Sequence, residues 1–279
     1  DEDGSLWSWG FGGSGRLGQN DTVARSSPTQ IGTGETWSDL GTDGRTLSKN
    51  GCLKSDGTLW VWGENNFGQL GQNSKTYYSS PVQLAGSWKN FGCSSSVFAA
   101  INTSGELWVV GRNGNGQLGD NSEVHKSSPV QIPGTTWSSV TCAYPFLTAT
   151  KTDGTLWAWG NNVAGQLGQN NEVKYSSPVQ IPGTSWAFAT VSEKHIWATK
   201  TNGELWAIGF GGQGELGQNS RTQYSSPVQI PGTWAVEQNK MGGGYTWFFG
   251  IKSDATLWFM GGGGYNTNGQ DGSGHCGGV

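Results

Sequence analysis

The stretch Leu156-Trp157-Ala158-Trp159-Gly160, followed by the loop Asn161-Asn162-Val163-Ala164-Gly165-Gln166-Leu167-Gly168-Gln169-Asn170, decides the fold of this chain. It is typical of a short apolar strand and a glycine-punctuated loop. Successive copies begin 48 to 53 residues apart, at Leu6, Leu59, Leu107, Leu156, Leu205 and Leu257. Strand segments that recur with a period of about 50 residues, without helical segments between them, indicate a propeller or a solenoid.

Each repeat divides into four strand-like pieces. In the third complete repeat they cover residues 137–142, 146–151, 156–159 and 176–181. Turn signals separate the pieces, and no apolar period of 3.6 residues is present. The sequence predicts an all-β fold, a β-propeller of four-stranded blades, as one domain over residues 1–260 with a Gly-rich segment at 261–279. About six blades fit the length. Five closed blades or an incomplete seven stay open, because the pieces do not add up to whole blades.

Short polar pairs separate the second and third strands of most repeats. They are Asp56-Gly57, Ser104-Gly105, Asp153-Gly154 and Asn202-Gly203. We interpret them as two-residue type I′ hairpins, in which both positions need a positive φ. Asp254-Ala255 lacks the glycine, so its hairpin should be the most strained or should use another turn. These acidic residues are therefore interpreted as turn formers rather than as catalytic carboxylates.

The chain is rich in tryptophan, with 16 Trp among 279 residues. One follows the leucine of every third strand, at Trp7, Trp60, Trp108, Trp157, Trp206 and Trp258. Trp9, Trp62 and Trp159 lie two residues further on the same face of that strand. Both faces are thus apolar, as expected of a blade packed between two others. A row of sugar-stacking platforms is the alternative interpretation.

Composition excludes several classes of partner. The net charge is −4 and the 16 Lys and Arg form no run, which argues against nucleic acid as a partner. No apolar run approaches the length of a membrane-spanning helix, so membrane insertion is not expected. No signal peptide is apparent. The chain opens in mid-repeat, so we expect further residues before Asp1.

The four cysteines are too few for a disulfide scaffold in a chain of this length. Cys52 takes a repeat position that holds small residues elsewhere, which predicts a small buried side chain. Cys93 and Cys142 are one period apart, and a disulfide between them stays an alternative. Cys276 lies in the Gly-rich tail and is a candidate free thiol.

No motif indicates catalysis or a cofactor. The three histidines lack zinc-ligand spacing with cysteine, and neither a nucleophile elbow nor a phosphate-binding loop occurs. The segment 266–271 has oxygen ligands at alternate positions, but it lacks the bidentate Glu that completes a calcium loop. We therefore predict no catalytic residues, no metal ligands, no cofactor and no enzyme activity.

Two resemblances suggest a function. The stretch Trp62-Gly63-Glu64-Asn65-Asn66-Phe67-Gly68-Gln69-Leu70-Gly71 and its copies resemble the regulator-of-chromosome-condensation repeat family over nearly the whole chain. That resemblance implies four-stranded propeller blades, commonly seven, and a guanine-nucleotide-exchange type of regulator. The last copy departs from it, because Gly269-Gln270-Asp271-Gly272 has Asp in place of Leu. The Trp-rich repeats with Ser-Ser-Pro-Val-Gln are also similar in style to virion proteins of marine tailed phages.

The main prediction follows the second resemblance. It is a non-enzymatic structural or binding propeller, as a virion surface, fibre or adhesion component in an extracellular or virion-surface location. It would contact a protein partner or a surface glycan, and an oligomer within a larger assembly stays open. The alternatives are a protein-interaction regulator of the exchange-factor type and a lectin.

A ring of variable residues is the candidate partner-binding surface. They precede the Ser-Ser-Pro that leads into each fourth strand, whose proline fits an edge strand. The predicted residues are Arg25, Tyr77, Tyr78, Lys126, Lys174, Tyr175 and Tyr224. Tyr and Arg are enriched at binding hot spots, and loops tolerate the variation that recognition needs. Long side chains that merely shield the outer edge strand are the alternative.

Overall fold

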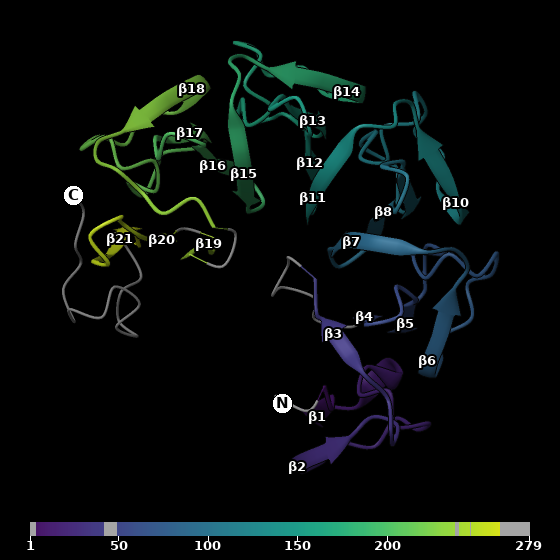
Figure 1. Cartoon of the computed structure of the whole chain (residues 1–279). Coiled ribbons are helices and arrows are strands. Elements are labelled where there is room, and N and C mark those ends of the chain that lie inside the picture. The colour runs from purple at the N-terminus through teal and green to yellow at the C-terminus, as the bar shows by residue number, and fades with distance from the viewer. Residues whose placement is uncertain (1–3, 42–48, 238–239, 246, 263–279) are drawn as a thin grey trace. The chain divides into compact units, whose positions relative to one another are not determined.

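The computed structural model describes residues 4–41, 49–237, 240–245 and 247–262, and its strands form six antiparallel sheets (Figure 1). The chain divides into two compact units, which are described separately below. The first comprises Asp1–Gly114 with Asp120–Tyr144, and the second comprises Asn115–Gly119 with Pro145–Val279. In the part of the chain that the structure describes, no helix is long and apolar enough to cross a bilayer.

The first unit holds two complete blades and one two-stranded sheet, β1-β2. The complete blades have the strand orders β3-β4-β5-β6 and β10-β9-β8-β7, so each follows the chain order across the sheet. β11 packs against β7 and β8. The strands are β1 (Trp7–Gly10), β2 (Arg25–Gln30), β3 (Trp37–Asp39), β4 (Lys49–Lys54), β5 (Leu59–Gly63), β6 (Tyr78–Leu84), β7 (Trp88–Cys93), β8 (Val97–Asn102), β9 (Leu107–Gly111), β10 (Lys126–Ile132) and β11 (Trp137–Ala143). A 3-10 turn, η1 (Gly13–Gly15), lies between β1 and β2.

The second unit contains one complete blade, β15-β16-β17-β18, with β12, β13 and β14 before it and the three-stranded sheet β19-β20-β21 after it. Its strands are β12 (Phe146–Lys151), β13 (Leu156–Gly160), β14 (Tyr175–Ile181), β15 (Trp186–Val191), β16 (His195–Lys200), β17 (Leu205–Gly209), β18 (Tyr224–Ile230), β19 (Met241–Gly243), β20 (Trp247–Ile251) and β21 (Leu257–Gly261). The predicted all-β class with four-stranded blades is confirmed. The single domain over 1–260 stays a prediction, and most of 261–279 lies outside the described residues.

The third strand of each blade supplies its core. In β5, Leu59 and Val61 are fully buried and Trp62 is 3% exposed. Trp60, on the same face as Trp62, is only half-buried. Its ring lies 4.2 Å from the Lys54 ammonium, which is also 5.0 Å from the ring of Trp37. Both faces of β5 therefore carry buried apolar side chains, as predicted, and Trp60 is covered by a lysine side chain.

The hairpins between second and third strands differ from the predicted type. Lys54 N donates to Thr58 O at 2.9 Å and Gly57 N donates to Lys54 O at 3.0 Å, which closes a three-residue loop. Only Gly57 in that loop has a positive φ, 81°, so the type I′ prediction is wrong and the loop has a G1 bulge. The Asp56 carboxylate accepts bonds from Thr58 N and Oγ1, at 2.9 and 2.6 Å, which requires no positive φ at Asp56. Ala255 takes the glycine position with φ 66°, in line with the strain predicted there.

The described cysteines are buried thiols. Cys52, Cys93 and Cys142 form no disulfide, so the alternative of a Cys93–Cys142 bridge is not realised. Burial, with the nearby Asp39 charge, raises the pKa of Cys52 to about 12, which keeps the thiol protonated and unreactive. Cys276 lies outside the described residues.

Candidate protein-interaction face

The loops between third and fourth strands are held by buried amides. Asn65 Nδ2 donates to the carbonyls of Ser74 and Thr76, at 3.0 and 2.9 Å, and Asn65 Oδ1 accepts from Leu70 N at 2.9 Å. Gln69 Oε1 accepts from Phe67 N at 2.9 Å. Because both side chains are fully buried, they fix the backbone path of the loop. The residues that project from this path are thus held in place by the scaffold.

We call the end of a blade where its third strand stops and its fourth begins the loop end. Five predicted residues each pair there with the glycine that ends the third strand. The pairs are Arg25 with Gly10, Tyr78 with Gly63, Lys126 with Gly111, Tyr175 with Gly160 and Tyr224 with Gly209. All five glycines have a positive φ, from 99° to 118°. The predicted residues therefore occupy equivalent backbone positions. Arg25, Tyr77, Tyr78 and Lys126 belong to the first unit, and Lys174, Tyr175 and Tyr224 to the second.

The tyrosines among the predicted residues differ in exposure. Tyr78 and Tyr224 are half-buried and pack against the apolar cores of their blades. The Tyr175 hydroxyl accepts from Asn171 Nδ2 at 3.0 Å. Tyr77 is 42% exposed, and its hydroxyl donates to Asn66 Oδ1. Tyr77 and Lys174 are thus the exposed members of the predicted set, and the other five are half-buried.

Two of the predicted cations are neutralised within their own loops. Arg25 Nη2 lies 2.6 Å from Asp21 Oδ2, and this bond lowers the pKa of Asp21. Lys126 Nζ lies 3.4 Å from Asp120 Oδ2. Burial raises the pKa of Asp120, but hydrogen bonds from neighbouring side chains, first that of Ser122, outweigh it and leave the pKa below its ordinary value.

A cluster that sequence reasoning missed lies at the loop end of the first unit. It consists of Phe67, Arg112, His125 and Tyr144, and we call it the Arg112 cluster. The Arg112 guanidinium carbon is 5.0 Å from the ring centre of Phe67 and 5.0 Å from that of Tyr144. Phe67 and His125 meet edge to face with ring centres 5.2 Å apart. These residues come from three loops, with Arg112 and His125 at the two ends of the loop between β9 and β10, so no single short motif signals the cluster, although His125 directly precedes the predicted Lys126.

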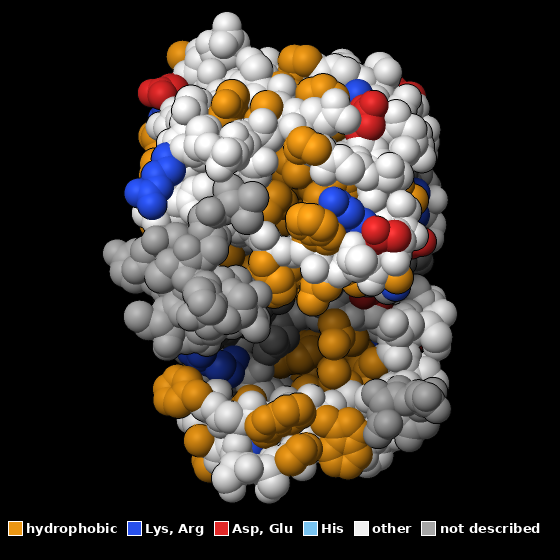
Figure 2. Space-filling view, turned by 90° about the vertical axis from the view of Figure 1, so that its left-hand side faces the viewer, with side chains coloured by type: hydrophobic (Ala, Val, Ile, Leu, Met, Phe, Trp, Pro, Cys, Tyr) orange, Lys and Arg blue, Asp and Glu red, His pale blue; other side chains and the backbone are white. Residues whose placement is uncertain are grey.

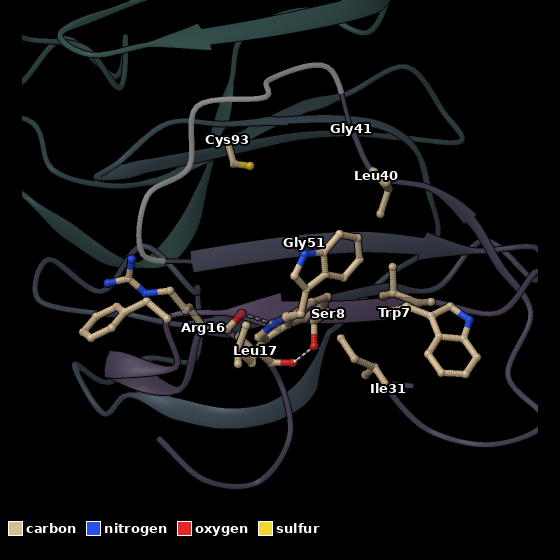
Figure 3. Close-up of a pocket in the computed structure, with 13 residues that line it drawn as sticks. Trp7, Ser8, Arg16, Leu17, Ile31, Leu40, Gly41, Gly51 and Cys93 are labelled. Carbon is tan, nitrogen blue, oxygen red and sulfur yellow. Dashed lines mark hydrogen bonds between the residues drawn. The ribbon is translucent and has the colours of Figure 1, made fainter. Parts of the chain in front are cut away.

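The first blade has an apolar cavity beside β1. It has a volume of about 570 Å³ and is lined by residues that include Trp9, Leu17 and Ile31 (Figure 3). Trp9 is 60% exposed, whereas Trp62 at the equivalent position is 3% exposed and donates from its Nε1 to Arg16 O at 3.0 Å. Hydrophobic side chains gather at the lower end of Figure 2, the level at which Figure 1 places β1 and β2.

A buried contact in the second unit combines a hydroxyl, an imidazole and a carboxylate. Ser192 Oγ is 2.6 Å from His195 Nδ1, and His195 Nε2 is 3.5 Å from Glu215 Oε1. All three residues are at most 1% exposed, so a substrate cannot reach the hydroxyl. Within the described residues, no group of three or more His, Cys, Asp or Glu could hold a metal ion. The calcium-like segment 266–271 lies outside them.

Comparison with known proteins gives the chain a family. The model of the regulator of chromosome condensation (RCC1) repeat matches residues 3–39, 56–100, 104–149 and 153–192, more than half of the chain. The structure of Prp20p from Saccharomyces cerevisiae, described with its binding to Gsp1p and histones, superposes with a TM-score of 0.79 at 18% identity, over 94% of this chain and 69% of that one. The fold is thus a β-propeller with four-stranded blades, and about six blades fit the sheets.

Two curated relatives match shorter regions. "Protein RCC2 homolog" of Danio rerio is 40% identical over 75 residues, which is 26% of this chain and 15% of that protein. "E3 ubiquitin-protein ligase HERC2" of Homo sapiens is 30% identical over 94 residues, 30% of this chain and 2% of that protein. The chain thus spans a small part of either relative, and the ligase activity in the second name does not transfer with the match.

These comparisons correct the predicted location and narrow the predicted function. The extracellular or virion-surface location is wrong, because the matches are to an RCC2 homologue and to Prp20p, a protein described by its binding to Gsp1p and histones. A binding propeller with a protein partner is supported. A virion, fibre or adhesion role, a glycan partner and an oligomer are not supported, and the alternative of a protein-interaction regulator is favoured over them.

Proposed function

We propose that this chain, which belongs to the family of regulator of chromosome condensation (RCC1) repeat proteins, is a non-catalytic regulator. It acts by binding other proteins. Its partner-binding residues are those predicted at the loop ends, together with the Arg112 cluster. Each unit contributes its own members, and the exposed ones make the first contacts.

One observation carries this proposal. The predicted residues occupy equivalent backbone positions opposite a glycine, yet their side chains are Arg, Tyr or Lys. A buried position in the same loops instead keeps one chemistry, a side-chain oxygen that accepts from the backbone N two residues earlier, at Gln69, Gln117, Gln166 and Glu215. Different chemistry on an identical backbone is what a recognition surface on a rigid scaffold requires. Tyr78 and Tyr224 combine a structural role with a binding role, because each packs against the apolar core of its blade and is still only half-buried.

The relatives suggest probes for a binding test. The Prp20p structure is described with Gsp1p and histones, so immobilised Gsp1p and core histones are the probes. The variant Tyr77→Ala/Lys174→Ala removes two exposed loop-end side chains without opening a core. We expect it to weaken binding of at least one probe about tenfold, the effect of losing a binding hot spot. Lys89→Ala, an exposed lysine of β7 away from the loop end, is the matched control. Equal binding by the double variant and the parent would reject the loop ends as the site.

An exchange-factor activity is the second candidate. The observation that favours it is the likeness of 94% of this chain to Prp20p, a protein described by its binding to Gsp1p. The test loads Gsp1p with a fluorescent guanine nucleotide and follows its release. Release accelerated by the chain would support exchange. Binding without acceleration would leave an interaction regulator.

A further inference from the structure

Arg112 is held in place before any partner arrives. It directly follows β9, and its backbone N donates to Ser96 O at 2.9 Å. Its guanidinium lies 5.0 Å from each of two aromatic rings, Phe67 and Tyr144. An arginine stacked in this way loses little rotamer freedom on binding, because folding has already ordered it.

Arg112 forms no ion pair with a carboxylate of the described residues. It differs in this from Arg25, which pairs with Asp21 at 2.6 Å, and from Lys126, which pairs with Asp120 at 3.4 Å. A guanidinium carries five N–H donors, and no hydrogen bond from the Arg112 side chain to a described residue is present. Those donors are available to a ligand.

Lys75 adds positive charge near this site. His125 is exposed, and its Nδ1 accepts from Asn113 N at 3.0 Å, which leaves Nε2 as a donor toward solvent. Burial lowers the pKa of His125, and the charges of Arg112 and Lys75 lower it further, so both cations act on the imidazole. An anionic group is therefore favoured here, and a second cation is not.

We propose that the Arg112 cluster binds an acidic segment of a partner protein, with one Asp or Glu carboxylate held by two N–H groups of the Arg112 guanidinium. The planar fork of a guanidinium matches a carboxylate in this way. Nucleic acid is the poorer fit, because the faces of Phe67 and Tyr144 that would stack on bases are taken by Arg112, and the chain carries a net charge of −4. This inference rests on the proposed function, since it assigns the partner chemistry of one part of the loop ends.

The test uses three synthetic probes and the whole chain. They are a labelled 12-residue peptide of alternating Glu and Leu, the same peptide with Gln for Glu, and a 12-nucleotide single strand of DNA. Fluorescence polarisation at low and at physiological salt measures binding. We expect the Glu peptide to bind and the Gln peptide and DNA to bind at least tenfold more weakly, because a charge-assisted hydrogen bond contributes about 1.5–3 kcal/mol, or tenfold or more in Kd.

Variants locate the binding to the guanidinium. Arg112→Ala should weaken binding of the Glu peptide at least tenfold. Arg112→Lys should weaken it severalfold, because an ammonium keeps the charge and loses the fork. Arg221→Ala, an exposed arginine of the second unit, is the matched control and should change Kd less than about twofold. An unchanged melting temperature shows that each variant remains folded.

Three outcomes would overturn the proposal: no binding of the Glu peptide by the parent, equal binding by Arg112→Ala, or DNA binding as tight and as dependent on Arg112. The proposed function fails separately. If Tyr77→Ala/Lys174→Ala still loses Gsp1p or histone binding while the Glu peptide does not bind, the loop ends remain the interface and only the acidic partner is rejected.

Discussion

Two kinds of loop follow the third strands, and they reach the same backbone path in different ways. One kind has a buried asparagine two residues after the glycine that ends the strand, at Asn65, Asn113 and Asn162. The other has glycine there, at Gly12 and Gly211. In both kinds of loop the carbonyl of this residue accepts a hydrogen bond from the backbone N three residues later. The distance is 3.1 Å from Gly68 N to Asn65 O and 2.9 Å from Gly214 N to Gly211 O.

The carbonyl eleven residues downstream explains the difference. In the asparagine loop, Thr76 O accepts from Asn65 Nδ2 at 2.9 Å. In the glycine loops, the equivalent oxygens of Val23 and Thr222 lie only 2.2 and 2.1 Å from where a Cβ would stand on Gly12 and Gly211. The carbonyl thus fills the space of the missing side chain. One backbone path is held by an amide in the first case and by direct backbone packing in the second.

An aromatic ring covers the glycine loops. The Phe11 and Phe210 rings lie 2.4 and 2.3 Å from the place of a Cβ on Gly13 and Gly212. A cation lies over each ring, Arg16 at 4.9 Å from the Phe11 centre and Lys194 at 5.2 Å from the Phe210 centre. In the asparagine loop of β5, Glu64 takes the place of Phe11, and the ring that contacts His125 and Arg112 is that of Phe67, further along the loop. Both kinds of loop thus place a cation over an aromatic ring, but at different loop positions.

The largest effect is expected from Asn65→Ala. The substitution leaves two buried carbonyls and Leu70 N without their partner, which should lower the free energy of unfolding by about 3 kcal/mol. Urea denaturation measures it. Asn66→Ala, exposed in the same loop, is the control and should cost less than about 1 kcal/mol. If the two variants are equally stable, the amide does not hold the path and the comparison between the loops fails.

Gly211→Ala tests whether the glycine loop has room for a side chain at this position. A methyl group there would meet Thr222 O at 2.1 Å, so the backbone must shift, and we expect a loss of about 2 kcal/mol. Gly114→Ala is the matched control, because its nearest neighbour would be His125 Cε1 at 3.9 Å. Thermal unfolding of both variants measures the difference. A neutral Gly211→Ala would mean that this loop can relax toward the asparagine kind.

The sequence predicted the repeat and its strands because each of them is a local pattern. The apolar alternation of Leu59, Val61 and the residues around them is contained in five positions, and the loop-end position of Tyr78 follows from counting within one repeat. The difference between the two loops was missed, because it depends on the distance from a side chain to a carbonyl eleven residues away. The hairpin type was missed because Asp and Gly suit both a type I′ turn and a G1 bulge.

The Arg112 cluster was beyond sequence reasoning for a further reason. Phe67, Arg112, His125 and Tyr144 are brought together by the packing of adjacent blades, and none is unusual in its own repeat. The exposed Tyr77 and the half-buried Tyr78 are adjacent tyrosines, and only the structure separates them. Burial of side chains at the blade ends depends on neighbours that a single repeat does not contain.

A smaller effect on stability is expected in the hairpins between second and third strands. There the same backbone conformation occurs with glycine in four repeats and with alanine in the last. The hairpins at Gly57, Gly105, Gly154 and Gly203 place glycine at a positive φ, and the last hairpin places Ala255 there at 66°. Ala255 N donates to Lys252 O at 2.9 Å, as Gly57 N does to Lys54 O at 3.0 Å. Ala255→Gly should therefore relieve strain and stabilise the chain by about 0.5–1 kcal/mol after the entropy cost of glycine. Ala24→Gly, exposed and at a negative φ, should instead destabilise it slightly. Chemical denaturation that finds the same sign for both would remove strain as the explanation.

The smallest effect concerns the asparagine loop that has a histidine. His125 Nδ1 accepts from Asn113 N at 3.0 Å, and burial, followed by the charges of Arg112 and Lys75, lowers the pKa of His125 below 6.5. Between the folded-state pKa and 6.5 the unfolded chain binds more protons, so stability rises with pH across that window. The contribution of His125 is fully present above about pH 6.5 and is lost as the pH falls through the folded-state pKa.

The test compares the parent with His125→Gln between about pH 7.5 and pH 5, a range that brackets the ordinary pKa of histidine. The free energy of unfolding should fall less steeply with decreasing pH in the variant than in the parent. The carboxylates with lowered pKa values, such as Asp120, titrate below 3.8 and do not enter the window. Parallel curves for the two proteins would show that the imidazole is as free in the folded chain as in the unfolded one, and that the bond from Asn113 N does not distinguish this loop from the others.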